Sequence, residues 1–179
     1  MGISQYHMNY SADEDRIFIF VRDHAATEHA FGLTRRLFKK LWPALGKTVQ
    51  EMSETVAKTA PDMRQDVLQL EQQGAVSQAI QTGALSNNPV PEVENRVSYL
   101  VKTIRIAAGE DGGKVLTLSD DKRSMNIPIS HDQLIVLCDA LRTLVVKSDW
   151  NLDPRYPWED DGKADPSAAG AAADKPIRH

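Results

Sequence analysis

The sequence predicts an α+β protein made of two repeated βββα units, antiparallel meanders each backed by a helix. A helical connector joins the units, and a flexible C-terminal tail follows them. Three observations support this fold class. Residues 31–49 have a pattern that returns 96 positions later. In each half an alternating apolar pattern gives way to one with helical spacing. A proline-containing segment separates the halves.

The repeat is clearest in the apolar positions and in one turn. Residues 11–15 (SADED) align with residues 107–111 (AAGED) at the same offset. The aligned apolar residues are Phe31, Leu33, Phe38, Leu41, Leu45 and Val49 with Ile127, Ile129, Leu134, Leu137, Leu141 and Val145. One structural unit used twice would give this pattern. Two independent hairpin-plus-helix units would give a weaker version of it, so both origins stay open.

Residues 1–59 are expected to form the first unit. Strands are predicted at Ile3–Tyr10, Arg16–Arg22 and His29–Leu33. The middle segment, RIFIFVR, is β-branched or aromatic throughout, and both of its faces are apolar. We therefore expect a central strand that is covered on both sides.

A helix is predicted to follow the third strand, with Thr34 as its N-cap. Its apolar face is defined by a spacing of three or four residues at Leu37, Leu41, Leu45, Val49, Met52 and Val56. Pro43 lies within this pattern and lacks the amide hydrogen that a helix requires. We therefore expect a kink or a break near Leu41–Trp42.

Residues 60–95 are expected to form the connector. Pro61 is suited to the first position of a new helix, which should end near Gly83. The positions assigned to its inner face are Met63, Val67, Leu70, Ala75 and Ile80. Asn87–Glu94, with Pro89 and Pro91, is predicted to be a linker.

Residues 96–149 are expected to form the second unit. A long strand is predicted over Val97–Ile106, followed by a hairpin of Lys114–Leu118 and Met125–Ile129. Ser130 and Gln133 have the spacing of a capping box. The box should open a helix over His131–Lys147 with a wide apolar face.

Residues 150–179 form the tail, which begins with aromatic residues and then becomes rich in Ala, Gly and Pro. Trp150, Leu152, Tyr156 and Trp158 favour burial. They could fold back on their own domain, or they could bind a protein partner. The later part of the tail has a composition typical of disorder.

Composition narrows the class of protein. The chain has 179 residues, a net charge of −4 and a single cysteine, Cys138. A disulfide framework is excluded, and Cys138 lies in an apolar helical pattern typical of an inert core thiol. No apolar run approaches the about 20 residues needed to span a bilayer. We expect a cytoplasmic protein that does not associate with membranes.

One surface could bind anions or nucleic acid. Basic residues recur on the outer side of the first helix, at Arg35, Arg36, Lys39, Lys40 and Lys47. Aromatic and basic residues of the strands, Phe18, Phe20, Tyr99 and Arg105, could stack bases and contact phosphates. The simpler interpretation is a solvated helix face and a sheet core.

No catalytic, cofactor or metal motif is present. His131 beside Asp132 suggests an acid–base pair, but no nucleophile is placed to join them. We therefore expect a non-enzymatic interaction module, an adaptor or assembly component of a larger complex that self-associates. A single-stranded DNA- or RNA-binding regulator is the alternative.

Overall fold

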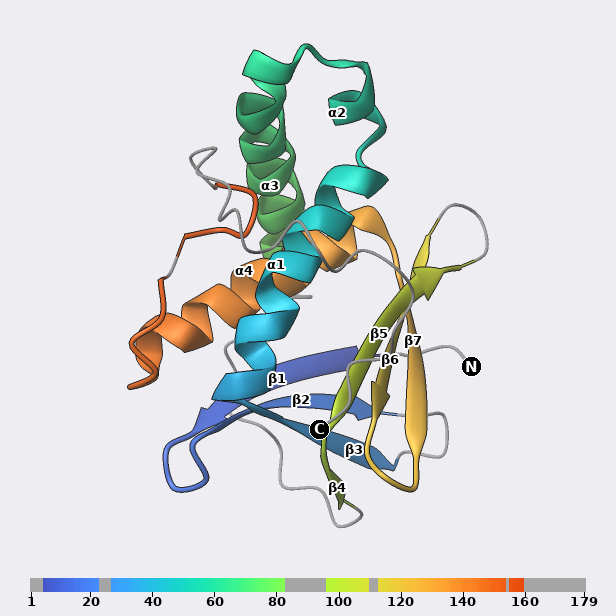
Figure 1. The fold of residues 1–179 in the computed structure, drawn as a ribbon, viewed down its shortest axis with the longest axis vertical. Helices are drawn as coiled ribbons and strands as arrows, with labels where there is room; N and C mark the ends of the chain where they lie inside the picture. Colours follow the sequence, from blue (N-terminus) through green and yellow to red (C-terminus); the bar gives the residue numbers. More distant parts are fainter. Residues whose placement is uncertain (1–4, 23–26, 83–95, 110–112, 154, 160–179) are drawn as a thin grey trace, which may run out of the picture.

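The strands of the protein form two separate sheets (Figure 1). The structure is a computed structural model, and it describes residues 5–22, 27–82, 96–109, 113–153 and 155–159. The first sheet has the order β1-β2-β3-β4, and the second has the order β5-β6-β7. The strands are β1 Gln5–Ser11, β2 Arg16–Arg22, β3 Glu28–Thr34, β4 Arg96–Leu100, β5 Thr103–Ala108, β6 Lys114–Ser119 and β7 Ser124–Ile129. With four α-helices in the same residues, the protein is α+β, as predicted.

Strand β2 lies between β1 and β3 and is antiparallel to both. Its alternate residues Ile17, Ile19 and Val21 belong to the main hydrophobic core. Phe18 and Phe20 point to the opposite face, where they form a small buried cluster with Ala30. The predicted central strand, covered on both sides, is therefore confirmed.

The single long strand predicted over Val97–Ile106 is wrong, because the chain changes sheets within it. The Val101 amide donates to the Gly32 carbonyl oxygen of the first sheet at 3.0 Å. The next amide, of Lys102, donates to the Ser119 carbonyl oxygen of the second sheet at 2.8 Å. As a result β4 pairs with β3 in parallel, while β5 begins the other sheet.

The helices are α1 Arg35–Met52, α2 Glu54–Lys58, α3 Arg64–Gln81 and α4 His131–Lys147, and a 3₁₀ turn at Pro61–Met63 precedes α3. The Thr34 hydroxyl caps α1, as predicted. The predicted capping box also opens α4.

Of the kink or break expected near Leu41–Trp42, the break is wrong, because α1 continues through Pro43, and the kink stays a prediction. Pro43 lies on the exposed side of the helix, where water can hydrogen bond the carbonyl group that loses its partner. The helix ends instead at Ser53, whose hydroxyl accepts from the Val56 amide at 3.0 Å and so caps α2.

Helix α4 connects the two halves of the fold. It contacts α1, α3 and β1, so the helix of the second unit packs on the sheet of the first (Figure 1). Leu116 and Leu118 of the second sheet belong to the same hydrophobic core as Ile17 of the first. The βββα repeat is therefore visible only in part, as β1–β3 followed by α1 and β5–β7 followed by α4.

Two helical glycines should respond in opposite ways to alanine. A Cβ atom at Gly46 would lie 2.5 Å from the carbonyl oxygen of Pro157, whereas a Cβ at Gly74 would have no heavy atom within 4 Å. Gly74→Ala should raise the free energy of unfolding by about 1 kcal/mol through helix propensity. Gly46→Ala should lower it, since overpacking costs about 1–3 kcal/mol and outweighs that gain. Urea denaturation of both variants is the measurement. Equal stabilisation by both would contradict the contact between Gly46 and Pro157.

Candidate interaction surfaces

The aromatic part of the tail folds back on its own chain. Trp150 is fully buried, and its indole Nε1 donates to Oδ1 of Asp15 at 2.5 Å. The Tyr10 hydroxyl donates to the same oxygen at 2.9 Å. The rings of Tyr10 and Phe38 lie 6.0 and 5.7 Å from the Trp150 ring, measured between centroids. Trp150 therefore fixes the end of α4 against the turn between β1 and β2.

Tyr156 anchors the next part of the tail. Its hydroxyl donates to Asp139 of α4 and accepts from Nε2 of Gln72 of α3 at 2.8 Å. Its ring stacks on Trp158 at 4.9 Å, and the Arg142 guanidinium lies 4.8 Å from the ring centroid. Burial, assisted by the hydrogen bond to Asp139, raises the pKa of the Tyr156 hydroxyl. The hydroxyl therefore remains a proton donor at neutral pH.

These contacts limit how the tail could bind a partner, as the sequence predicts it to do. Trp158 is buried like Trp150, while Leu152 and Tyr156 are half-buried against the same core. The structure thus places all four side chains against their own chain. Binding of a partner by this segment stays a prediction, and it would have to use the half-buried residues or displace the segment.

Replacing Trp150 should test how much the core depends on the tail. Trp150→Ala removes a fully buried ring, and such truncations cost about 3–5 kcal/mol. Trp150→Phe keeps an aromatic ring but loses the donor to Asp15 and part of the ring volume, so its loss of unfolding free energy should be smaller than that of Trp150→Ala. Equal, negligible effects of both variants on urea denaturation would contradict the placement of Trp150.

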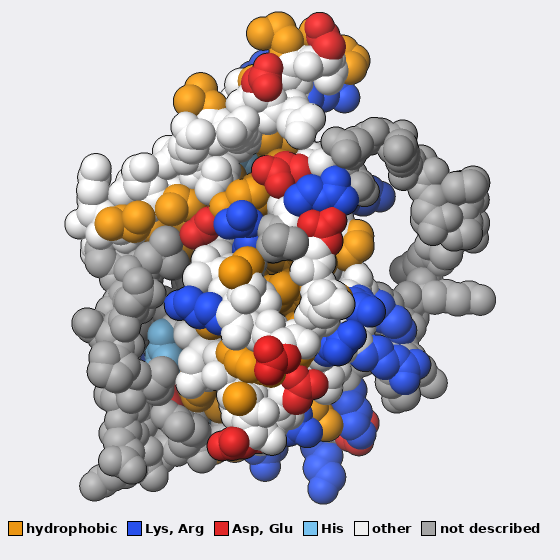
Figure 2. Space-filling view, turned by 90° about the vertical axis from the view of Figure 1, so that its left-hand side faces the viewer, with side chains coloured by type: hydrophobic (Ala, Val, Ile, Leu, Met, Phe, Trp, Pro, Cys, Tyr) orange, Lys and Arg blue, Asp and Glu red, His pale blue; other side chains and the backbone are white. Residues whose placement is uncertain are grey.

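The predicted basic residues all lie exposed on α1: Arg35, Arg36, Lys39, Lys40 and Lys47. Figure 2 shows Lys and Arg side chains gathered on the right and lower part of the face drawn. Lys47 lies 3.8 Å from the Glu51 carboxylate one turn later. The N-terminal half of α1 therefore presents a basic surface, which we call the α1 basic patch.

The strand residues proposed for nucleic-acid binding do not share one surface. Phe18 and Phe20 are only 8% and 4% exposed and face away from the main core. Tyr99 lies on the opposite face of the same sheet, stacked on Phe31 at 4.9 Å. Arg105 is exposed on β5 of the other sheet. The four residues are therefore not brought together with one another.

A polar cluster joins the end of α1 to α3 and α4. The Ser53 hydroxyl donates to Oε1 of Glu71 at 2.9 Å, and Nε2 of His131 lies 3.8 Å from the other carboxylate oxygen. Nδ1 of His131 lies 3.7 Å from Asp132. Ser53 is buried, and its hydroxyl oxygen also accepts from the Val56 amide at 3.0 Å. The cluster acts as a link between helices.

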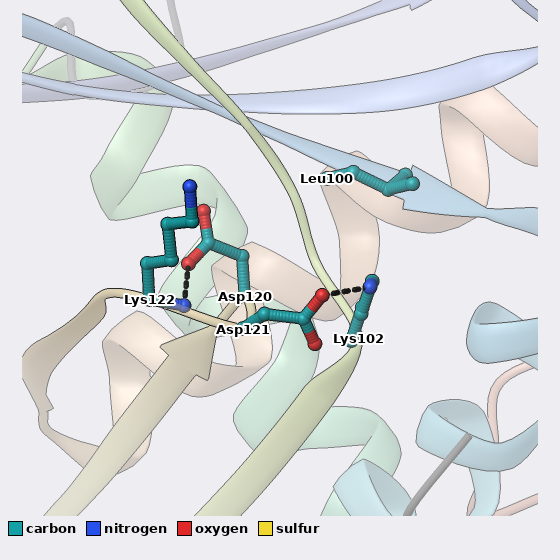
Figure 3. A pocket seen from close by; sticks show the side chains of 5 residues that line it. All are labelled: Leu100, Lys102, Asp120, Asp121 and Lys122. Atoms are coloured by element: carbon teal, nitrogen blue, oxygen red, sulfur yellow. Dashed lines mark hydrogen bonds and ion pairs between the residues drawn. The ribbon is translucent and has the colours of Figure 1, made fainter.

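A shallow pocket lies where β4 passes into β5, and it is lined by Leu100, Lys102, Asp120, Asp121 and Lys122 (Figure 3). Lys102 pairs with Asp121 across it. The Asp120 carboxylate accepts from the backbone amide of Lys122 at 2.8 Å, and this bond lowers its pKa. With a volume of about 200 Å³ the pocket is smaller than typical ligand sites. Both of its acids already have partners, Asp120 within the turn and Asp121 at Lys102.

The outer face of α3 exposes residues that the sequence assigned to the inside. Met63, Leu70 and Ile80 are 55%, 70% and 63% exposed, so their predicted inner positions are wrong. The buried residues of α3 are Leu68, Ala75 and Ala79. Three of the five exposed large hydrophobic residues in the described part of the chain therefore lie on α3 or the turn before it.

The C-terminal part of this surface is also uncharged. From Gln72 to Pro91 the sequence has no Asp, Glu, Lys, Arg or His. At 3.6 residues per turn, the side of α3 opposite Ala75 is formed by Leu70, Gln73, Ser77, Ile80 and Gln81, which we call the α3 outer face, and the exposed Asp66 precedes them on the same side. The uncharged run was the sequence signal that could have indicated this face.

Among the described residues, no group of three or more His, Cys, Asp or Glu side chains could hold a metal ion. Within the same residues no helix combines the length and the apolar character that crossing a bilayer requires. No protein family model, no curated protein and no solved structure matches this chain.

Proposed function

We propose that this protein is a non-enzymatic interaction module, an adaptor or assembly component that binds a protein partner through the α3 outer face. The observation that carries the proposal is the exposure of Leu70 and Ile80 on a helix face that has no charged residue from Gln72 to the end of α3. Single exposed apolar residues are common on protein surfaces, but several on one face are typical of an interaction site.

The energetics agree with this role. Full burial of a Leu or Ile side chain contributes about 1.5–3 kcal/mol. The remaining residues of the face, Gln73, Ser77 and Gln81, can hydrogen bond at the rim without the desolvation cost of a charge. A partner that covers the face would therefore gain apolar burial and lose little by covering polar groups. The predicted cytoplasmic location is compatible with such a role and remains a prediction.

The proposal predicts that one added charge abolishes partner binding. Wild-type protein, Leu70→Glu and Gln65→Glu should each be used as bait in a lysate of the source cells. Gln65 is exposed on α3, about 140° from Leu70 around the helix, so it controls for the added charge. We expect Leu70→Glu to lose the proteins that wild type and Gln65→Glu retain, since a buried unpaired carboxylate is costly. Equal retention by all three baits would exclude the α3 outer face.

A second candidate function, binding of single-stranded nucleic acid, is favoured by the α1 basic patch. Arg35 and Arg36 lie in the first turn of α1, which has no acidic residue, and both are exposed. Positive charge is unfavourable at a helix N-terminus, and a bound phosphate would relieve that repulsion.

This candidate predicts salt-dependent binding of labelled single-stranded DNA or RNA, measured by fluorescence anisotropy at low and physiological salt. Arg35→Glu with Arg36→Glu should remove the binding. Lys58→Glu with Lys147→Glu reverses the same amount of charge at exposed sites outside the patch and should weaken binding much less. The absence of binding even at low salt would remove this candidate.

A further inference from the structure

We infer that an acidic segment of the tail, residues 160–165, binds the α1 basic patch of its own chain and competes there with nucleic acid. The segment lies outside the described residues. The contact with the patch is independent of the proposed functions, whereas the competition rests on the second candidate function, the binding of nucleic acid. Three observations support the contact: where the described part of the tail ends, how far the next residues reach, and the charges of the two partners.

The described end of the tail lies on α1. The indole Nε1 of Trp42 donates to the Arg155 carbonyl oxygen at 3.2 Å. One turn later along the helix, the Pro157 carbonyl oxygen lies 2.5 Å from the position that a Cβ atom of Gly46 would occupy. Residues 160–165 therefore continue from an existing contact with α1.

This contact is on the same side of α1 as part of the basic patch. A spacing of four, three and four residues places four residues along one side of the helix: Arg35, Lys39, Trp42 and Gly46. The tail contacts the last two of them, and the first two are exposed. The other residues of the patch form a second row about 100° further around the helix axis: Arg36, Lys40 and Lys47.

A turn directs the following residues back along α1. Between residues 155 and 157 the chain runs toward the C-terminal end of the helix. The Glu159 amide then donates to the Tyr156 carbonyl oxygen at 3.0 Å, and the Glu159 carboxylate accepts from the Tyr156 amide at 2.8 Å. A turn of this kind reverses the chain. The residues after Glu159 are therefore aimed toward the N-terminal half of α1, where most of the patch lies.

The length of chain suffices for the contact. Asp160 and Asp161 are three and four residues beyond Pro157, which allows about 10–14 Å of extended chain. Lys39 lies about 10.5 Å along the helix axis from Gly46, which Pro157 contacts. The two carboxylates can therefore reach the ammonium group of Lys39 while Pro157 stays on α1.

The charges of the two partners are complementary. Residues 160–165 contain three aspartates and one lysine. Helix α1 has five exposed basic residues, and no acidic residue precedes Glu51 within it. The positive end of the helix dipole adds to the charge of the patch. The patch therefore attracts carboxylates, and those of Asp160 and Asp161 follow directly after the contact with α1.

The covalent connection makes weak ion pairs sufficient. Exposed ion pairs contribute little individually, but a short connection gives the segment an effective concentration in the millimolar range at the patch. A nucleic acid must displace the segment before it contacts the same basic residues. The tail therefore lowers the affinity of the patch for polyanions.

Cross-linking of the full chain tests the contact. A carbodiimide joins a lysine ammonium group to a carboxylate that touches it, and peptide mass spectrometry identifies the pair. At low salt and low protein concentration we expect links from Asp160 or Asp161 to lysines of the patch, and about 0.5 M salt should suppress them. Lys114 lies 3.6 Å from Glu51, so the link between these two is an internal control for the reaction.

DNA binding by matched variants tests the competition. Asp160→Asn with Asp161→Asn removes both carboxylates and keeps the length of the tail. Asp62→Asn with Asp66→Asn removes the same charge at exposed sites of the 3₁₀ turn and α3. In anisotropy titrations with labelled single-stranded DNA at low salt, the first variant should bind at least about threefold more tightly than wild type. The second variant should change the affinity much less.

Each outcome decides a separate point. The absence of links to the patch, while Lys114 is linked to Glu51, would overturn the contact. Links whose yield rises with protein concentration would also overturn it, because they join two chains. Equal DNA affinities of wild type and the variant with Asp160→Asn and Asp161→Asn would overturn the competition. If the links form but neither protein binds DNA, the second candidate function and the competition fail, and the contact stands.

Discussion

The burial of the N-terminal half of α4 on all sides is the constraint on which the rest of the structure depends. Its residues 134–138 are consecutive and all buried, which a helix can achieve only when neighbours surround it. Helix α1, helix α3 and strand β1 supply those neighbours. Tyr156 closes another side through its hydrogen bond to Asp139. The tail thereby becomes part of the core.

The same constraint explains why Leu70 and Ile80, two large apolar residues of α3, face away from the core. Close packing against a surrounded helix favours small residues, and α3 meets this need with Ala75 and Ala79. Its larger residues Leu70 and Ile80 are then left on the opposite side. Leu68 is also buried, but the exposed Leu70 and Ile80 would gain stability from a partner that covers them.

Local signals predicted the parts of the fold that depend on neighbouring residues. The segment Arg16–Arg22 and the helix His131–Lys147 have the predicted bounds, because alternation and a capping box are read within a few residues. The split between β4 and β5 depends on hydrogen bonds of Val101 and Lys102 to residues distant in sequence. Periodicity within that segment cannot show which sheet each amide joins.

The candidate sites follow the same division. The exposure of the α1 basic patch could be predicted from its position opposite the apolar residues of α1. The separation of Phe18 from Tyr99 could not, because it depends on how β4 pairs with β3. The apolar residues of α3 occur on more than one side, so their spacing could not decide which side α4 covers.

The neutral character of the α3 outer face has a consequence for specificity. Charged interfaces gain association rate and reject incorrect partners through like-charge repulsion. A face formed by Leu70, Ile80 and uncharged polar residues has neither property, so only shape can set its register. The spacing of Leu70 and Ile80 supplies that shape, because the two residues lie ten positions and about 15 Å apart along the helix. The sequence feature that makes α3 a poor core helix is therefore also the feature that would make its surface selective.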